Sequence, residues 1–195
     1  DLLRKRAHVV RQHTANVLSV QNIMARNTGA RFSVKRIQEL TKQELTTLLA
    51  EETQVLAVTS SLVVLDCLRH QIKMLEQSVH KRLHHTPSYE QLLTVQGIGT
   101  ILAQTITLET GAISRFPTVG HSASYCRCVD STKISNGKRK GTGNVKNGHP
   151  YLAWAYMEAA QFTMRFQPEA QRFYQRMLVK RRYNTILARK AEAHK

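Results

Sequence analysis

Apolar residues recur at helical spacing along most of the chain. Over residues 2–26 they fall three, four or seven positions apart, which predicts an amphipathic helix that the glycine at position 29 ends. A short helix is expected over 33–40. Thr41 and Glu44 then have the spacing of a capping box, and they open a further helix that reaches about residue 51.

The longest predicted helix occupies residues 53–85, a stretch without glycine or proline. Its apolar residues form nearly a heptad seam: Val55, Val58, Leu62, Leu65, Leu68, Ile72, Leu75 and Val79. At 1.5 Å per residue this helix would be about 50 Å long. Because a lone helix of this kind is unstable in water, it needs a partner. The partner is either another part of the chain or a second copy in a coiled coil, and we favour the coiled coil.

A tight turn is expected at Gly97-Ile98-Gly99. Thr86 and Pro87 start a helix before it, and Ala103 lies on a new helix after it, which is the pattern of a helix-hairpin-helix turn. The two glycines let the backbone turn tightly and approach a ligand, and the free N–H groups at the start of the next helix can hold a phosphate. The alternative is a plain helix–helix turn without a ligand.

The rest of the chain is expected to be helical apart from one segment. Gly111 ends the helix that follows the turn, and a short helix reaches about Cys126. Residues 127–134 have an extended pattern, and Pro150 and Pro168 start the last two helices. The sequence therefore predicts a mainly α protein, with a long coiled-coil-like helix followed by a compact helical domain. The predicted regions are a helical linker (1–52), a coiled-coil helix (53–86) and a C-terminal domain (87–195).

The charge of the chain points to a polyanionic partner. It carries 29 Lys and Arg against 13 Asp and Glu, a formal net charge of +16, and the excess is strongest after residue 130. Such a charge favours nucleic acid, with an anionic membrane surface as the weaker interpretation. No apolar run approaches the roughly 20 residues of a membrane-spanning helix, and no signal peptide is visible. The first residues, DLLRKRAHVV, lack an initiating Met, so we expect a piece of a longer protein.

Cysteine adds little to this picture. Cys67, Cys126 and Cys128 contain no CxxC pair, so we expect neither a disulfide framework nor a zinc site with the nearby His121.

The glycine–lysine segment, SNGKRKGTGNVKNG at residues 135–148, combines mobile backbone with positive charge. Its glycines oppose a helix and let main-chain N–H groups face an anion. Its basic residues supply salt-dependent attraction to phosphate; they are Lys138, Arg139, Lys140 and Lys146. The alternative is a disordered basic linker. Ser135 is well placed to attack phosphorus, but no His or carboxylate adjoins it in sequence to activate its hydroxyl.

The last predicted helix also carries a basic surface, which includes Arg176. A solvated face is the simple explanation. With so few acidic residues nearby, we expect contact with a nucleic-acid backbone instead.

Three stretches carry a resemblance to a known family: LLTVQGIGTILAQTITLETGAISRF, SNGKRKGTGNVKNGHPYLAWAYMEAAQF and RFYQR. In order and spacing they resemble the C-terminal domain of bacterial insertion-sequence transposases of family 110, and the second stretch looks closest to its subgroup 1111. The resemblance covers about residues 87–190, and the preceding helices are similar to that family's linker and coiled coil. His149-Pro150 departs from the wording often seen in the family, and this departure touches only a helix start.

The resemblance implies a DNA recombinase that acts under the direction of a structured bridge RNA, through a covalent serine–DNA phosphoester. In that family an N-terminal RNase H-like domain with four acidic residues holds divalent metal, and the C-terminal domain supplies a serine. By this resemblance Ser135 is the nucleophile and Ser131 is the alternative. No such acidic set is visible in this chain. We therefore expect no cofactor here and Mg²⁺ in an upstream domain, and we expect this chain alone to bind DNA or RNA without recombining it.

The partners implied are DNA, the bridge RNA and a second copy of the chain through the coiled coil, with no membrane. The location implied is the bacterial cytoplasm, at the nucleoid. Two other classes stay open. One is a non-catalytic helix-hairpin-helix module that binds nucleic acid, and the other is a ribosomal or RNA-chaperone protein, which the charge alone favours.

Overall fold

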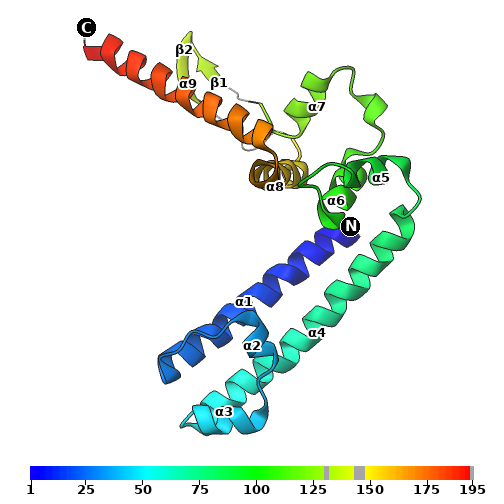
Figure 1. Ribbon diagram of the computed structural model, residues 1–195, viewed down its shortest axis with the longest axis vertical. Coiled ribbons are helices and arrows are strands. Elements are labelled where there is room, and N and C mark those ends of the chain that lie inside the picture. The colour runs from blue at the N-terminus through cyan, green and yellow to red at the C-terminus, as the bar shows by residue number, and fades with distance from the viewer. Residues whose placement is uncertain (130–131, 143–147, 194–195) are drawn as a thin grey trace. The chain divides into compact units, whose positions relative to one another are not determined.

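The computed structural model describes residues 1–129, 132–142 and 148–193, and these form nine α-helices and one two-stranded hairpin (Figure 1). The expectation of a mainly α protein with one long helix is confirmed. The chain divides into two compact units, residues 1–82 and residues 83–195. Each unit is described by itself.

The first unit contains four helices: α1 (Leu2–Thr28), α2 (Val34–Gln38), α3 (Lys42–Leu48) and most of α4 (Glu52–Leu83). Gly29 ends α1 with a left-handed backbone conformation, φ 68°, and its N–H donates a hydrogen bond to the carbonyl of Ala25. The predicted end of this helix is therefore confirmed.

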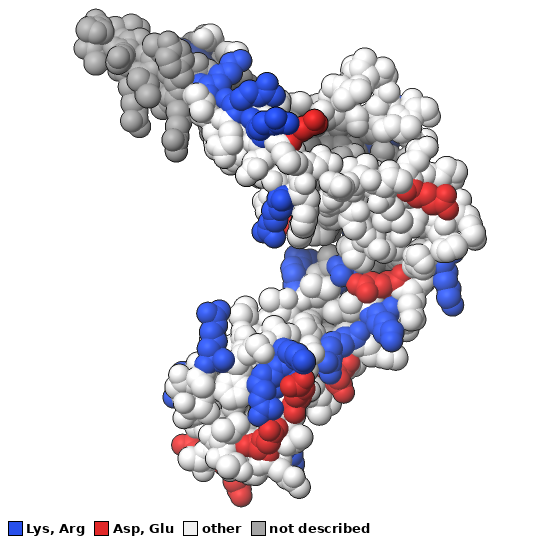
Figure 2. All heavy atoms as spheres, in the orientation of Figure 1, with Lys and Arg blue, Asp and Glu red and all other residues white. Residues whose placement is uncertain are grey.

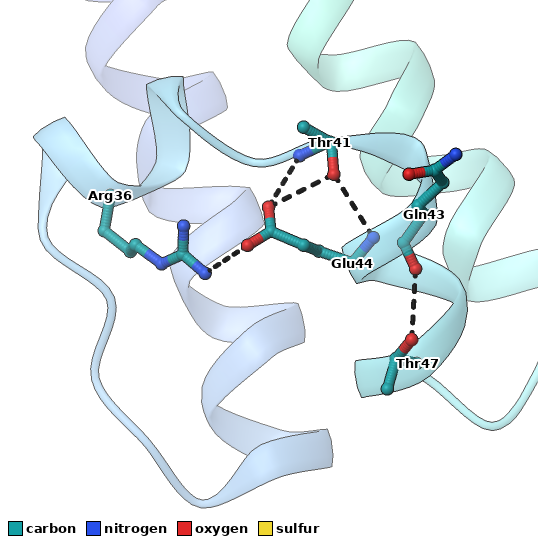
Figure 3. A network of polar contacts seen from close by, with 5 residues as sticks. All are labelled: Arg36, Thr41, Gln43, Glu44 and Thr47. Carbon is teal, nitrogen blue, oxygen red and sulfur yellow. Dashed lines mark hydrogen bonds and ion pairs between the residues drawn. The ribbon is translucent and has the colours of Figure 1, made fainter.

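The capping box at the start of α3 is also confirmed, and it is part of a larger network (Figure 3). The N–H of Glu44 donates to Thr41 Oγ1 at 3.3 Å, and the N–H of Thr41 donates to Glu44 Oε2 at 3.0 Å. Arg36, just before α3, donates to the other Glu44 oxygen at 2.7 Å. This hydrogen bond lowers the pKa of Glu44 and raises that of Arg36. The capping carboxylate thus also ties α2 to α3.

The long helix α4 finds its partner within the same chain. It runs side by side with α1 in the opposite direction, and α2 and α3 pack against its first half (Figure 1). Arg6 on α1 donates to Glu76 on α4 at 2.7 Å. The shared core contains residues from all four helices and the short link before α3: Val17, Val20, Met24, Ile37, Leu40, Leu45, Val55, Val58 and Leu65. The heptad seam allowed either a partner helix in the same chain or a second copy of the chain. In the structure, helices of the same chain pack against α4.

By length and composition alone, α4 passes the test for a helix that could cross a membrane, which its apolar runs had not led us to expect. The mean hydropathy of its most apolar stretch is 1.3. A single helix of this kind is weak evidence for a membrane span, because core helices of soluble proteins can have the same length and composition.

The second unit has its core between two helices, α6 (Thr100–Thr110) and α8 (Pro150–Phe166). Leu102 and Ile106 of α6 pack against Leu152, Ala155 and Ala159 of α8. The remaining elements surround this pair: α5 (Pro87–Leu93), the 3₁₀ turn η1 (Ile113–Arg115), α7 (Val119–Tyr125), β1 (Thr132–Ser135), β2 (Lys138–Thr142) and α9 (Pro168–Ala193). Pro87, Pro150 and Pro168 each stand at the first position of a helix, as predicted.

The glycine–lysine segment differs from the expected loop, because its first part is a β-hairpin. Strands β1 and β2 are antiparallel, and they are joined by Asn136 and Gly137, whose φ angles are 53° and 69°. Two positive φ angles in a two-residue connection are typical of a type I′ turn, for which Asn-Gly is the preferred sequence. The register shifts between Lys133 and Ile134, so that Lys140 is an additional residue in β2.

A first prediction concerns His13, which lies on α1 in the seam with α4. Its Nε2 is buried without a hydrogen-bond partner among the described residues. Burial, and then the positive charge of Arg69 on α4, lower the pKa of His13 below its usual 6.5. The folded state therefore favours the neutral ring, while the unfolded chain takes up a proton at its ordinary pKa. The free energy of unfolding should fall as the pH drops below about 6.5.

Thermal unfolding followed by circular dichroism at about pH 7.5 and about pH 5.5 measures this effect. We expect His13→Leu to show a smaller loss of Tm at the lower pH than the parent chain. His8 is exposed on the same helix, so His8→Leu is the matched control and should keep the full loss. An equal pH dependence in the parent chain and in His13→Leu would contradict the prediction.

Candidate functional site

Ser135 lies at the exposed end of the hairpin, as the last residue of β1. Its cross-strand partner is Lys138, the first residue of β2. Directly opposed residues of an antiparallel pair extend to the same face of the sheet, with Cβ atoms about 4.5–5.5 Å apart. The structure therefore brings a hydroxyl and an ammonium group together beside the turn of the hairpin. Among the described residues, none is hydrogen-bonded to the Ser135 hydroxyl.

The other predicted basic residues are placed only in part. Lys140 is exposed in β2, and Arg176 is exposed on α9. Arg139 lies in β2 opposite Ile134. Lys146 and the alternative nucleophile Ser131 lie outside the described residues.

The two ends of the hairpin segment are held together at its base. The N–H of His149 donates to the carbonyl of Tyr125 at 2.7 Å, and Arg127 donates to the carbonyl of Gly148 at 3.1 Å. Gly148 has a φ of 82°, and a Cβ there would lie 2.7 Å from the Tyr125 carbonyl oxygen. Position 148 is thus a glycine because the backbone on the other side of the base approaches too closely for a side chain. These contacts join the backbone before the hairpin to the backbone after it, and we call them the base of the hairpin.

His149 fixes this base to the helical core. Its Nδ1 accepts a hydrogen bond from the Leu152 N–H at 3.3 Å, which caps α8. Its Nε2 lies 3.0 Å from Glu109 Oε2 on α6, and the two side chains are only 15% and 12% exposed. Because Nδ1 accepts, the ring proton resides on Nε2 and is donated to Glu109. Both ring nitrogens are therefore occupied, and His149 is a structural residue rather than a base for Ser135.

Aromatic side chains pack around His149 at the base of the hairpin. Tyr125 and Tyr151 lie 5.6 and 5.9 Å from the His149 ring, measured between centroids. The Arg115 guanidinium lies over Phe116 at 4.6 Å and over Tyr125 at 4.5 Å from the ring centroids. These cation–π contacts hold the segment before α7 against the base of the hairpin. Sequence reasoning missed this cluster, because its members come from segments that are far apart along the chain.

The two glycines of the Gly97-Ile98-Gly99 turn have different surroundings. Gly97 has a φ of 95°, and a Cβ there would lie 2.4 Å from Thr163 Oγ1 and 2.9 Å from the Ala159 carbonyl oxygen on α8. Thr163 Oγ1 also donates to the Gln96 carbonyl at 2.8 Å, which docks the turn on α8. Packing alone therefore requires glycine at position 97.

Gly99 caps the N-terminus of α6, is exposed, and has open space where a Cβ would stand. Of the two, only Gly99 stands beside exposed N–H groups of the kind that can receive a phosphate.

The turn and the hairpin base attach to different parts of α8. The hairpin base joins it at His149, and the turn joins it at residues 159–163. At 1.5 Å per residue these attachments are about 15–20 Å apart. The structure therefore holds the two predicted phosphate-binding elements on one helix without bringing them into a single pocket.

Among the described residues, no group of three or more His, Cys, Asp or Glu side chains comes together as metal ligands would. Cys126 is buried, and burial raises the pKa of its thiol. It belongs to the core between α6 and α8.

A second prediction separates the two glycines. We expect Gly97→Ala to lower the free energy of unfolding of the second unit by about 2–4 kcal/mol, because it combines overpacking against α8 with a left-handed backbone. Gly99→Ser should have little effect or stabilise slightly, because serine is a good N-cap and the space is open. Urea unfolding followed by the fluorescence of Trp154, the single tryptophan of the chain, reports on α8. Equal effects of the two substitutions would show that the turn does not pack as described.

Comparisons with known proteins relate part of the chain to one protein family. Residues 89–175 match the protein family described as Transposase IS116/IS110/IS902 family. A curated relative, the insertion element IS110 uncharacterized 43.6 kDa protein of Streptomyces coelicolor, is 26% identical over 145 residues. That alignment covers 70% of this chain and 36% of the relative, so the chain spans little more than a third of the relative's length. Together, the family match and the relative support residues 89–175 as a transposase domain similar to that of the IS110 family.

Proposed function

We propose that this chain is the serine-bearing part of a DNA transposase, in which Ser135 attacks a phosphodiester and becomes covalently linked to DNA. One observation carries the proposal. The serine stands exposed beside the turn of a hairpin whose flanking backbone is joined by hydrogen bonds, directly opposite Lys138. Similarity to a transposase family supports DNA strand cleavage and recombination as the reaction.

In the proposed step the serine oxygen forms a bond to phosphorus and the phosphodiester oxygen of one DNA strand leaves. The serine proton is lost, and the leaving oxygen takes up a proton. The covalent bond conserves the energy of the phosphodiester, so a hydroxyl of another strand can attack the same phosphorus and release the serine. This chain supplies the nucleophile, the positive charge that attracts the phosphate, and the base of the hairpin, which limits where the hydroxyl can lie.

Serine is a weak nucleophile until its proton is removed, and no described residue is hydrogen-bonded to the Ser135 hydroxyl to remove it. Nor do three or more His, Cys, Asp or Glu side chains come together among the described residues as metal ligands would. By the family resemblance, we assign the activating carboxylates and their Mg²⁺ to a separate acidic domain. The chain alone is then expected to bind nucleic acid without cleaving it.

The proposed partners follow from the charge and from the exposed faces. DNA and a structured guide RNA both fit a net charge of +16. For self-association, the proposed coiled coil would use the face of α4 that α1 leaves open, where Leu56, Val63 and Met74 are exposed. The place of action would be the bacterial cytoplasm, at the nucleoid.

A non-catalytic helix-hairpin-helix module is the second candidate function. The open N-terminus of α6 at Gly99 favours it, because that site could hold a phosphate without any role for Ser135.

A third prediction tests the serine in the full-length transposase, with its acidic domain and guide RNA present. We expect Ser135→Ala to reduce covalent protein–DNA adducts at least 100-fold, because alanine removes only the attacking oxygen. Labelled nicked DNA, followed by denaturing gel electrophoresis, detects the adduct.

Ser131→Ala is the matched control and should retain the adduct. Loss in Ser131→Ala with retention in Ser135→Ala would move the nucleophile to position 131. If wild type forms no adduct under conditions in which it recombines DNA, the chain belongs to the non-catalytic class.

A fourth prediction concerns the basic residues of β2. Replacing Lys138, Arg139 and Lys140 together by alanine should weaken binding of a 20-base-pair duplex and reduce the slope of log K against log salt. Removal of one phosphate interaction changes this slope by about 0.9. The fluorescence anisotropy of a labelled duplex at several salt concentrations measures both quantities. Lys35→Ala, at an exposed position on α2, is the control and should leave the slope unchanged. An unchanged slope in the triple variant would show that β2 does not contact phosphate.

A further inference from the structure

Exposed aromatic side chains are confined to two adjacent helices. Among the described side chains, every Phe, Tyr or Trp that is exposed belongs to α8 or α9: Trp154, Phe162, Phe166, Phe173 and Tyr174. Their exposed fractions run from 41% to 66%. The aromatic residues elsewhere in the described chain are buried or half-buried. Because these rings contribute little to the core, their position on the surface needs another explanation.

Basic residues alternate with these rings along the chain. Arg165 lies between Phe162 and Phe166, and Arg172 immediately precedes Phe173. The Arg165 guanidinium lies 5.3 Å from the centroid of the Phe162 ring. Figure 2 shows basic side chains gathered along the start of α9. We call the exposed residues around the junction of α8 and α9 the α8–α9 platform: Phe162, Arg165, Phe166, Arg172, Phe173 and Tyr174.

The chemistry of the platform selects its ligand. The three phenylalanine rings of the platform offer no hydrogen bonds, so they gain nothing from phosphate and cannot read the edges of paired bases. In a duplex the faces of the bases are already stacked on one another. Unpaired bases have free faces, and stacking on aromatic side chains between basic residues is how many proteins hold single strands. A second copy of this chain is a poor match, because a surface that covers the arginines should be acidic and the chain has 13 acidic residues against 29 basic ones.

We propose that the α8–α9 platform binds unpaired nucleotides by stacking their bases on its aromatic rings while its arginines contact the phosphates. This rests on the proposed function and deepens it, because it assigns a single-stranded segment to a site separate from the Ser135 hairpin. The segment is either displaced DNA or unpaired guide RNA, and both present the same bases and phosphates.

The test uses the 195-residue chain and fluorescein-labelled 20-nucleotide probes: oligo-dT, oligo-U and an abasic strand with the same number of phosphates. Anisotropy titrations at one salt concentration measure the affinities. We expect oligo-dT or oligo-U to bind at least tenfold more tightly than the abasic strand. The tighter of the two identifies the source as DNA or RNA.

The decisive variant is Phe166→Ala combined with Phe173→Ala, which should remove most of the preference for bases and leave abasic binding unchanged. Phe166→Tyr combined with Phe173→Tyr should restore the preference, because tyrosine keeps an aromatic ring. Leu18→Ala combined with Val34→Ala removes two exposed apolar side chains from α1 and α2 and is the matched control, with no change expected. Equal thermal unfolding by circular dichroism confirms that the variants fold.

Three results would overturn the proposal. Equal binding of oligo-dT, oligo-U and the abasic strand by wild type would show that only phosphates are recognised. An equal loss for all probes in the double alanine variant would show that the rings have no role in base recognition. A dimer in gel filtration that the double variant abolishes would show that a second copy covers the rings. Any of these results would disprove binding of unpaired nucleotides by the platform. If the full-length enzyme still forms the Ser135 adduct, the proposed function is unaffected.

Discussion

The close packing of α6 against α8 is the interaction on which the second unit depends. Ala155 and Ala159 on α8 are small enough for the α6 side chains to approach, and the same close approach leaves no room for a Cβ at Gly97. The cap of α8 then carries the base of the hairpin through His149, which is also paired with Glu109 on α6. One helix pair therefore sets the position of both the glycine turn and the backbone at His149 that follows the hairpin segment. The hydrogen bonds of His149 add to a small apolar core. Because hydrogen bonds are directional, they restrict the position of the hairpin base more than apolar packing would.

This arrangement reconciles two demands on the serine-bearing segment. A nucleophile that meets a phosphate held by another domain has to be exposed, yet its position must be limited if the reaction is to be efficient. A two-stranded hairpin by itself is marginally stable. Contacts of Tyr125 and Arg127 with Gly148 and His149 compensate at one end, and the Asn136-Gly137 turn fixes the register at the other. Ser135 is exposed beside the turn, while the backbone before and after the hairpin segment is joined by these hydrogen bonds.

Local signals in the sequence predicted most of the fold. Helix starts at Thr41 and Pro150 and the end at Gly29 depend on a few neighbouring residues, so the sequence contains the information in one place. The hairpin was missed although Asn136-Gly137 is a strong hairpin signal, because the glycine and lysine content of the segment favoured a loop. The roles of Gly97 and of the His149–Glu109 pair depend on contacts between distant parts of the chain, which periodicity cannot reveal. For α4, likewise, the apolar seam predicts that another helix packs against it, but the sequence does not identify that helix.

Helix α8 also sets the spacing between the base of the serine-bearing hairpin and the aromatic platform. The hairpin base joins α8 at His149, and the platform begins at Phe162 and Phe166 near its other end. These positions are about 20–25 Å apart along the helix, which corresponds to about six or seven base-pair steps of duplex DNA. A nucleic acid that follows α8 from the hairpin base to the platform would thus span a nearly constant distance. The rigidity of a single helix makes that distance a property of the fold.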